Sequence, residues 1–223
     1  MTLALGLAAV LALASAPPGK LPYDTYCASC HGADLRGTTN GPSLRDAGAA
    51  DVDFQLVTGR MPAAVPWIEV GHRGQQLPDA TIKAIEAYIA AVAPGGPPIP
   101  VVTAGGDVSN GREVYVQNCR HCHGVDADGA SVGGAEWAPS LHRTSITQVA
   151  EAIRVGPGQM PRFGARQLDD RALRDVATYI FATDRREATP RVPVARDNPV
   201  PEGLFGWLAV GALALAAYAY ARH

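Results

Sequence analysis

The 223-residue sequence predicts an all-α protein with two small tandem domains and a C-terminal helix that crosses a membrane. Three observations support this prediction. A five-residue motif occurs twice, segments with helical spacing of apolar residues follow each copy, and residues 204–221 contain no charged side chain. A chain of this length has room for two small domains and one further element.

The repeated motif is Cys27-Ala28-Ser29-Cys30-His31, and its second copy is Cys119-Arg120-His121-Cys122-His123. Two cysteines three positions apart, followed directly by histidine, are the attachment pattern of c-type haem. Both sulfurs bond the porphyrin and the histidine ligates the iron. A zinc site would need two further ligands per motif, and a redox dithiol would not need the histidine. The motifs therefore predict two covalently bound haem c groups.

The residues around the two motifs also correspond. Gly19 and Gly111 lie 92 positions apart, as do Cys27 and Cys119, and a tyrosine follows each glycine by four residues. The sequence Pro-Ser-Leu occurs after each motif, at 42–44 and at 139–141. We interpret this as an internal duplication. The carbonyls of Pro42 and Pro139 are the expected acceptors for the second ring nitrogen of each motif histidine.

Each half contains two further predicted helices. The first covers residues 51–58 and 146–155, and the later one is opened by a capping box formed by Ser145 and Gln148. Both helices end at a glycine, Gly59 or Gly156. The second covers residues 80–92 and 171–182, where isoleucine, leucine and valine recur at helical spacing. Its tyrosines, Tyr88 and Tyr179, are expected to pack on the helix that leads to each motif.

Apart from Met1, the sequence contains two methionines, Met61 and Met160. Each follows a predicted helix end and precedes a proline, which is where a second axial ligand would reach the far side of a haem. A methionine is usually core filling, but the matching positions favour iron ligands here. The predicted axial pairs are His31 with Met61 and His123 with Met160. All six iron positions are then filled, which predicts electron transfer rather than substrate chemistry.

Several other residues could contribute to the haem sites. His72 and His142 do not occupy matching positions in the two halves, so we expect them at the surface. His121 lies between two cysteines and should point away from the iron. Polar contacts to haem propionates could come from three residues, each of which could equally be packed or exposed: Arg60, Trp67 and Trp137.

The chain divides by composition. Residues 1–16 resemble a signal peptide or an N-terminal anchor, although no basic residue precedes the apolar run. Residues 17–93 form the first predicted domain, 94–106 a Pro/Gly-rich linker and 107–187 the second domain. Residues 188–203 form a Pro-rich spacer, and 204–221 are long enough to cross a bilayer.

Arg222, directly after the predicted span, favours a cytoplasmic C-terminus. We therefore expect a protein of the cell membrane with both haem domains on the extracytoplasmic side, where haem c is attached. The 19 basic and 21 acidic residues give a net charge near zero. Nothing in this balance suggests nucleic acid as a partner.

Taken together, the motifs resemble the dihaem cytochrome c subunit of the actinobacterial cytochrome bcc menaquinol:cytochrome c reductase. The most specific parts are Thr58-Gly59-Arg60-Met61-Pro62-Ala63 and Pro201-Glu202-Gly203 before the predicted span. The resemblance implies two class I cytochrome c domains. It also implies electron transfer from a Rieske iron-sulfur protein, in a complex with cytochrome b, to the copper-A subunit of a terminal oxidase. The N-terminus departs from this family, because a basic leader would be expected there.

Two other functions are compatible with parts of the sequence. An electron-transfer subunit of a membrane dehydrogenase would use the same domains, but such subunits often carry three haem motifs and this chain has two. A dihaem peroxidase would need a haem with an open position, and the matching methionines argue against one.

Overall fold

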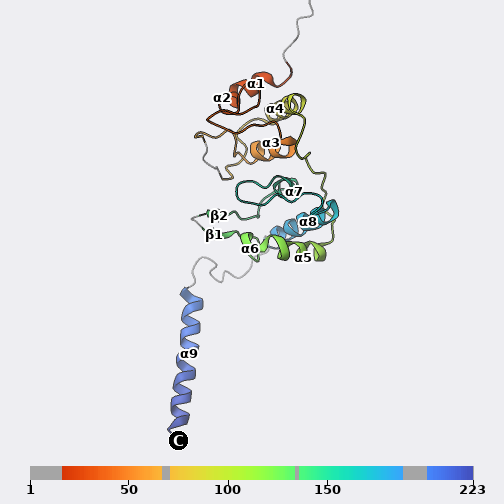
Figure 1. Cartoon of the computed structure of the whole chain (residues 1–223). Coiled ribbons are helices and arrows are strands. Elements are labelled where there is room, and N and C mark those ends of the chain that lie inside the picture. Colours follow the sequence, from red (N-terminus) through yellow and green to blue (C-terminus); the bar gives the residue numbers. More distant parts are fainter. Residues whose placement is uncertain (1–16, 67–70, 134–135, 188–199, 223) are drawn as a thin grey trace, which may run out of the picture. The chain divides into compact units, whose positions relative to one another are not determined.

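The computed structural model describes residues 17–66, 71–133, 136–187 and 200–222 (Figure 1). The chain separates into two compact units, Met1–Ala182 and Thr183–His223. The first unit contains both haem motifs. The predictions for residues 1–16 and for 188–199 of the spacer lie outside the described residues.

The first half of this unit contains four helices: α1 (Lys20–Tyr26), α2 (Ala28–His31), α3 (Gly48–Val57) and α4 (Asp79–Val92). Helix α4 packs against both α1 and α3. The rings of Tyr23 on α1 and Tyr88 on α4 lie 5.1 Å apart between centroids. Gly19 allows this approach, because a Cβ there would overlap the carbonyl oxygen of Ala84.

The second half contains α5 (Val108–Asn118), α6 (Arg120–His123), α7 (Ile146–Val155) and α8 (Asp170–Glu187). Tyr115 on α5 and Tyr179 on α8 repeat the ring contact, with 5.4 Å between centroids. A Cβ at Gly111 would overlap the carbonyl oxygen of Asp175, so α5 and α8 also cross at a glycine. Tyr88 and Tyr179 therefore pack against the helices that lead to the two motifs.

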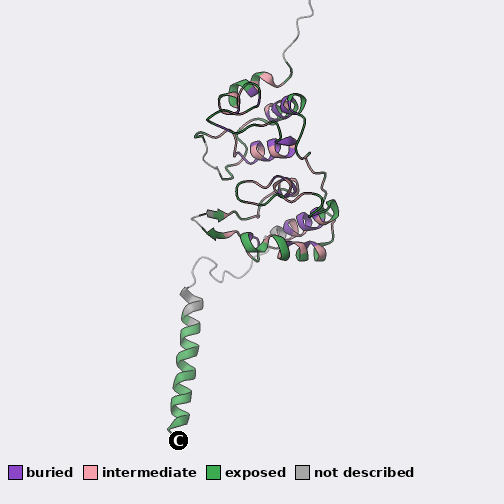
Figure 2. Ribbon diagram, in the orientation of Figure 1, coloured by how far each residue is buried: buried purple, intermediate pink, exposed green. Residues whose placement is uncertain are grey.

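Two separate hydrophobic cores are buried in the unit (Figure 2). The first comprises ten buried residues: Tyr23, Leu35, Ala47, Val52, Leu56, Ile82, Ile85, Tyr88, Ile89 and Ala93. The second comprises another ten: Tyr115, Ala127, Val149, Ala150, Ile153, Leu168, Leu173, Val176, Ala177 and Ile180. Helices α3 and α7 pack against each other and thereby connect the two halves.

The fold is not all-α. A small antiparallel sheet pairs β1 (Ala130–Gly133) with β2 (Glu136–Ala138) in the second half. Five positions separate Gly37 from Pro42 in the first half, whereas ten separate Gly129 from Pro139. The longer second loop can satisfy its backbone N–H and C=O groups by pairing with itself. The shorter first loop closes with a single bridge between Thr38 and Gly41.

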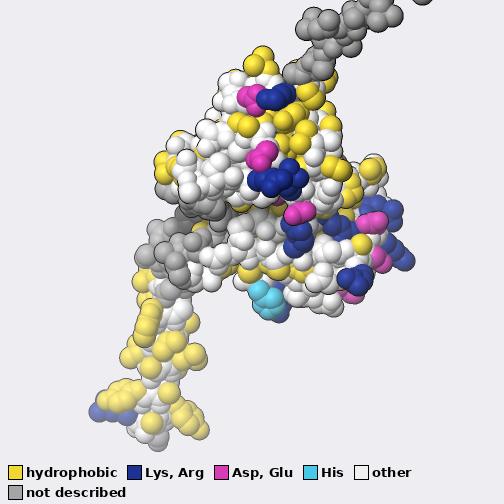
Figure 3. Space-filling model, turned by 45° about the horizontal axis from the view of Figure 1, so that its top comes forward, with side chains coloured by type: hydrophobic (Ala, Val, Ile, Leu, Met, Phe, Trp, Pro, Cys, Tyr) yellow, Lys and Arg dark blue, Asp and Glu magenta, His cyan; other side chains and the backbone are white. Residues whose placement is uncertain are grey.

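The expected membrane-spanning helix is also not found. A helix, α9 (Val200–Ala221), is present and carries hydrophobic side chains along its visible side (Figure 3). Nevertheless, none of the helices in the described residues is both long enough and apolar enough to span a membrane. The prediction relied on the length of 204–221 and on its lack of charged side chains. Residues 200–203, predicted as spacer, begin this helix.

Candidate haem sites

Each Cys-x-x-Cys-His motif is wound into a single helical turn. In the first, the amide of His31 donates to the carbonyl of Cys27 over 2.9 Å, and that of Cys30 donates to the same carbonyl over 3.1 Å. In the second, His123 and Cys122 donate to the carbonyl of Cys119 at the same two distances. One turn thus holds two sulfurs and one imidazole together, as attachment of one porphyrin requires.

Both motif histidines are buried and oriented by a proline carbonyl. Nδ1 of His31 lies 2.8 Å from the carbonyl oxygen of Pro42, and Nδ1 of His123 lies 3.0 Å from that of Pro139. Because a carbonyl can only accept, Nδ1 carries the proton and Nε2 keeps a lone pair for a metal. Burial lowers the pKa of His123, against a smaller opposing effect of the Pro139 hydrogen bond. That histidine is therefore held in the neutral form that ligates iron.

A tyrosine fixes the residue after each histidine. The hydroxyl of Tyr23 donates to the carbonyl of Gly32 over 2.6 Å, and that of Tyr115 donates to the carbonyl of Gly124 over 2.7 Å. Burial raises the pKa of both hydroxyls, so they stay protonated donors. The sequence analysis did not identify this role. The constant spacing of tyrosine, cysteine and glycine in the two halves was the available signal.

Met61 and Met160 are both partly buried, and each packs against the hydrophobic core of its own half. Cys27 packs against the same core as Met61, and Cys119 against the same core as Met160. Each half therefore brings its motif and its methionine loop to one core.

Two arginine side chains that the sequence did not indicate donate hydrogen bonds to the backbone of the loops that contain Met61 and Met160, here called the methionine loops. Arg73 donates to the carbonyl of Gly59 over 2.9 Å and to that of Pro62 over 2.8 Å, on either side of Met61. In the second half, Arg154 donates to the carbonyls of Phe163 and Leu168. These two arginines occupy different positions in their halves, so comparing the repeats could not reveal them.

The structure also places most of the remaining candidates. His72 and His121 are exposed, and Nε2 of His142 lies 3.0 Å from the carboxylate of Asp128. The guanidinium of Arg60 lies 4.7 Å from the centroid of the Phe54 ring. Trp137 is 66% exposed on β2. Trp67 lies outside the described residues.

The chemistry of the motifs fits haem c better than zinc. Burial raises the pKa of the Cys27 and Cys119 thiols to about 11, so both are protonated before any group is attached. No group of three or more histidine, cysteine or acidic side chains in the described ranges is arranged to hold a metal ion. Thioether attachment, in contrast, consumes both thiols and needs only the histidine that each motif supplies.

Comparisons with known proteins agree with this chemistry. The family model described as cytochrome c matches residues 16–93, and the model for cytochrome c oxidase, cbb3-type, subunit III matches residues 106–180. These matches, with one haem motif in each, define a protein with cytochrome c domains, which bind haem c covalently. We refer to the two matched regions as the first and second cytochrome domains.

Similar proteins of known family define the family of this chain more narrowly. The cytochrome bc1 complex cytochrome c subunit of Mycobacterium tuberculosis is 34% identical over 247 aligned positions, which span 100% of this chain and 88% of the relative. The subunit of the same name from Corynebacterium efficiens is 31% identical, over 90% of this chain and 74% of its own length. This chain belongs to the family of cytochrome bc1 complex cytochrome c subunits. The cbb3-type cytochrome c oxidase subunit CcoP of Rhodobacter capsulatus is 29% identical over 74% of this chain and 61% of the relative.

Proposed function

We propose that this chain carries electrons out of a cytochrome bc1 complex toward a terminal oxidase, using one haem c in each cytochrome domain. The observation that carries the proposal is the matched pair of sites. In each, a proline carbonyl orients the motif histidine, and the first motif cysteine and a partly buried methionine pack against one core. Haem c bound there would supply one-electron exchange between ferric and ferrous iron.

The roles proposed for the residues follow from their contacts. Cys27, Cys30, Cys119 and Cys122 would hold the two porphyrins covalently. His31 and His123 would ligate the irons through Nε2, since Nδ1 is engaged by Pro42 or Pro139. Met61 and Met160 would close the opposite positions, which excludes water and peroxide and raises the reduction potential.

The proposed partners follow from the relatives. Subunits named for the cytochrome bc1 complex support association with its Rieske and cytochrome b subunits. The likeness to cbb3-type oxidase subunits supports delivery to an oxidase, and we propose its copper-A subunit as the acceptor. Because haem c is attached outside the cytoplasmic membrane, the chain would work on that side of the membrane, bound to the complex.

Respiration in membranes tests this function. In a strain that lacks the chain, we expect quinol-driven oxygen uptake to be lost and to return with the wild-type gene. Oxygen uptake from an artificial donor that feeds the oxidase directly is the control and should persist. Normal quinol-driven uptake, with loss of alcohol- or sugar-driven uptake, would instead identify a dehydrogenase subunit. Loss of peroxide consumption alone would identify a peroxidase.

A further inference from the structure

Three acidic side chains are buried where α3 meets α4 and α7. Asp53 on α3 is 8% exposed, Glu86 on α4 is 9% exposed and Glu151 on α7 is fully buried. Asp53 and Glu86 belong to the first cytochrome domain, and Glu151 belongs to the second. A buried carboxylate without a paired charge is strongly unfavourable, so this carboxyl cluster of Asp53, Glu86 and Glu151 needs compensation.

The compensation provided by basic side chains is incomplete. Nζ of Lys83 lies 3.5 Å from Asp53 and 3.2 Å from Glu86, and the lysine side chain is 67% exposed. Oε1 of Glu86 and both side-chain oxygens of Glu151 have no hydrogen-bond partner in the part of the chain that is described. Helices α3 and α7 pack against each other, and the charge of Asp53 on α3 acts on Glu151 on α7. Two acidic groups therefore meet across the contact between the domains.

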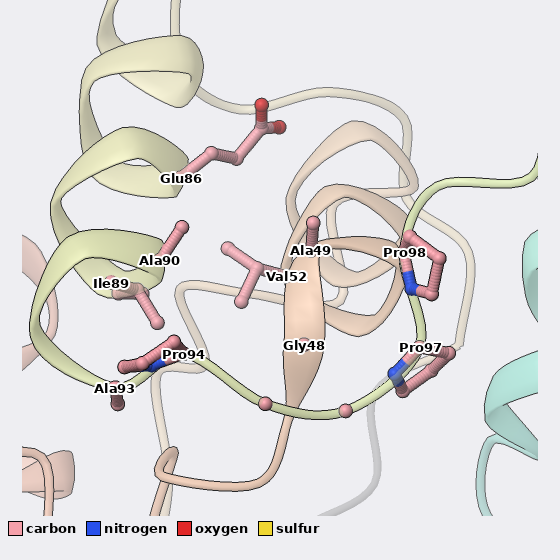
Figure 4. A pocket seen from close by; sticks show the side chains of 12 residues that line it. Gly48, Ala49, Val52, Glu86, Ile89, Ala90, Ala93, Pro94, Pro97 and Pro98 are labelled. Carbon is pink, nitrogen blue, oxygen red and sulfur yellow. The ribbon is translucent and has the colours of Figure 1, made fainter.

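A cavity of about 220 Å³ beside the cluster lies between α3, α4 and residues 93–98 (Figure 4). Apolar and small residues such as Val52 and Ile89 form most of its lining, and Glu86 is the one ionisable residue among them. Glu86 extends from α4 on the side of α3 (Figure 4). Glu86 therefore belongs both to the buried cluster and to the lining of this cavity.

We propose that the carboxyl cluster is a proton-binding site that fastens the two cytochrome domains together. A proton taken from solvent turns Glu151 into an O–H donor to the Asp53 carboxylate, so that a repulsive pair becomes a hydrogen bond across α3 and α7. Release of that proton restores two negative charges that face each other and loosens the contact. A metal ion is not needed for this arrangement, and the described residues provide no cluster that could hold one.

The pKa shifts of the buried acids give the pH range over which the carboxyl cluster takes up and releases its proton. Burial first, and then the charges of Asp53 and Glu86, raise the pKa of Glu151 to about 9. Burial and Asp53 raise the pKa of Glu86 to about 7. Asp51, also on α3, has its pKa raised by burial, and Gln55 and Arg162 act in the opposite direction.

In the unfolded chain, glutamate releases its proton near pH ~4.3. Between that pH and 9 the folded protein holds the extra proton on Glu151, so the contribution of Glu151 to stability is greatest at low pH and is lost as the pH rises to 9. For each extra proton that the folded state holds, the unfolding equilibrium constant rises about tenfold when the pH increases by one unit.

Glu151→Gln tests the site because an amide copies the shape and the donor of the protonated acid without its titration. Unfolding of the purified holoprotein would be followed by denaturant titration from pH 5 to pH 10. We expect the unfolding constant to rise less steeply with pH in this variant than in the wild type. The difference in slope should correspond to about one proton, which is a factor of about ten per pH unit. Glu113→Gln, on the exposed surface of α5, is the matched control and should behave as wild type.

Hydrogen exchange corrected for intrinsic rates locates the effect. In the wild type, peptides covering α3 and α7 should lose protection progressively as the pH rises from 5 to 9, whereas in Glu151→Gln they should keep it. Asp53→Asn removes the charge of Asp53 but leaves Glu151 buried, so it should weaken the pH dependence only in part. An unchanged pH dependence in both variants would overturn the proposal. Stabilisation of the wild type, but not of Glu151→Gln, by added calcium or magnesium would also overturn it in favour of a cation site. The inference does not depend on the identity of the electron donor or acceptor.

Discussion

Gly111→Ala is expected to lower the free energy of unfolding of the second cytochrome domain by about 3 kcal/mol, the upper end of typical overpacking costs. The added methyl group would overlap the carbonyl oxygen of Asp175 where α5 crosses α8. Two hydrogen bonds across the crossing oppose a shift of the helices that would relieve the clash. The carboxylate of Asp175 accepts hydrogen bonds from the amide of Asp107 over 2.9 Å and from the side chain of Asn110 over 2.8 Å.

Denaturant unfolding followed by haem absorption measures this loss. The same glycine-to-alanine change at Gly211 is the control, because a Cβ there would meet nothing within 4 Å. We expect Gly211→Ala to leave haem-domain stability unchanged. Wild-type stability in Gly111→Ala would mean that the close α5–α8 crossing does not hold the second domain together.

Blocking haem attachment in one domain is expected to unfold that domain alone. The Cys119→Ser/Cys122→Ser variant leaves the second domain with only its side-chain core, and a core of this size rarely supplies more than about 3–5 kcal/mol. Attached haem would add apolar contacts and a covalent link between the motif and the core. The variant should therefore carry one haem and lose helical circular dichroism, while the first domain stays folded.

His121→Ala is the matched control for this variant, since it changes an exposed residue between the same two cysteines. It should keep both haems and the wild-type helix content. A fully folded second domain in the double-serine variant would contradict the view that haem is part of its core.

The sequence predicted the elements whose signals are local. Helix α7 has the predicted bounds because Ser145 and Gln148 form a capping box and Gly156 ends the helix in the left-handed conformation. Helix α3 begins at Gly48 rather than at residue 51, and its N-cap residue, Ala47, makes no side-chain cap. Its start instead lies against the linker, where the amide of Ala50 donates to the carbonyl of Pro97 over 3.1 Å. No local signal marked that contact.

Features that depend on tertiary contacts could not be predicted. The β1–β2 hairpin arises from the extra residues of the second loop, which composition alone does not distinguish from coil. Arg73 reaches the methionine loop across 14 positions, and Glu151 meets Asp53 from the other domain. The C-terminal span was predicted from the length and lack of charge of 204–221, but no helix in the ranges that the structure describes is long and apolar enough to cross a membrane.

The central claim is that two haems are each closed by a histidine and a methionine. The most direct test is the weak far-red absorption band that oxidised haem c shows when methionine sulfur ligates its iron. It would be measured for the wild type, Met61→Leu and Met160→Leu, each with its haem content determined by mass spectrometry. We predict two haems in every protein and the loss of about half of the band in each variant. An undiminished band in either variant would show that its haem has a different ligand and would contradict the account.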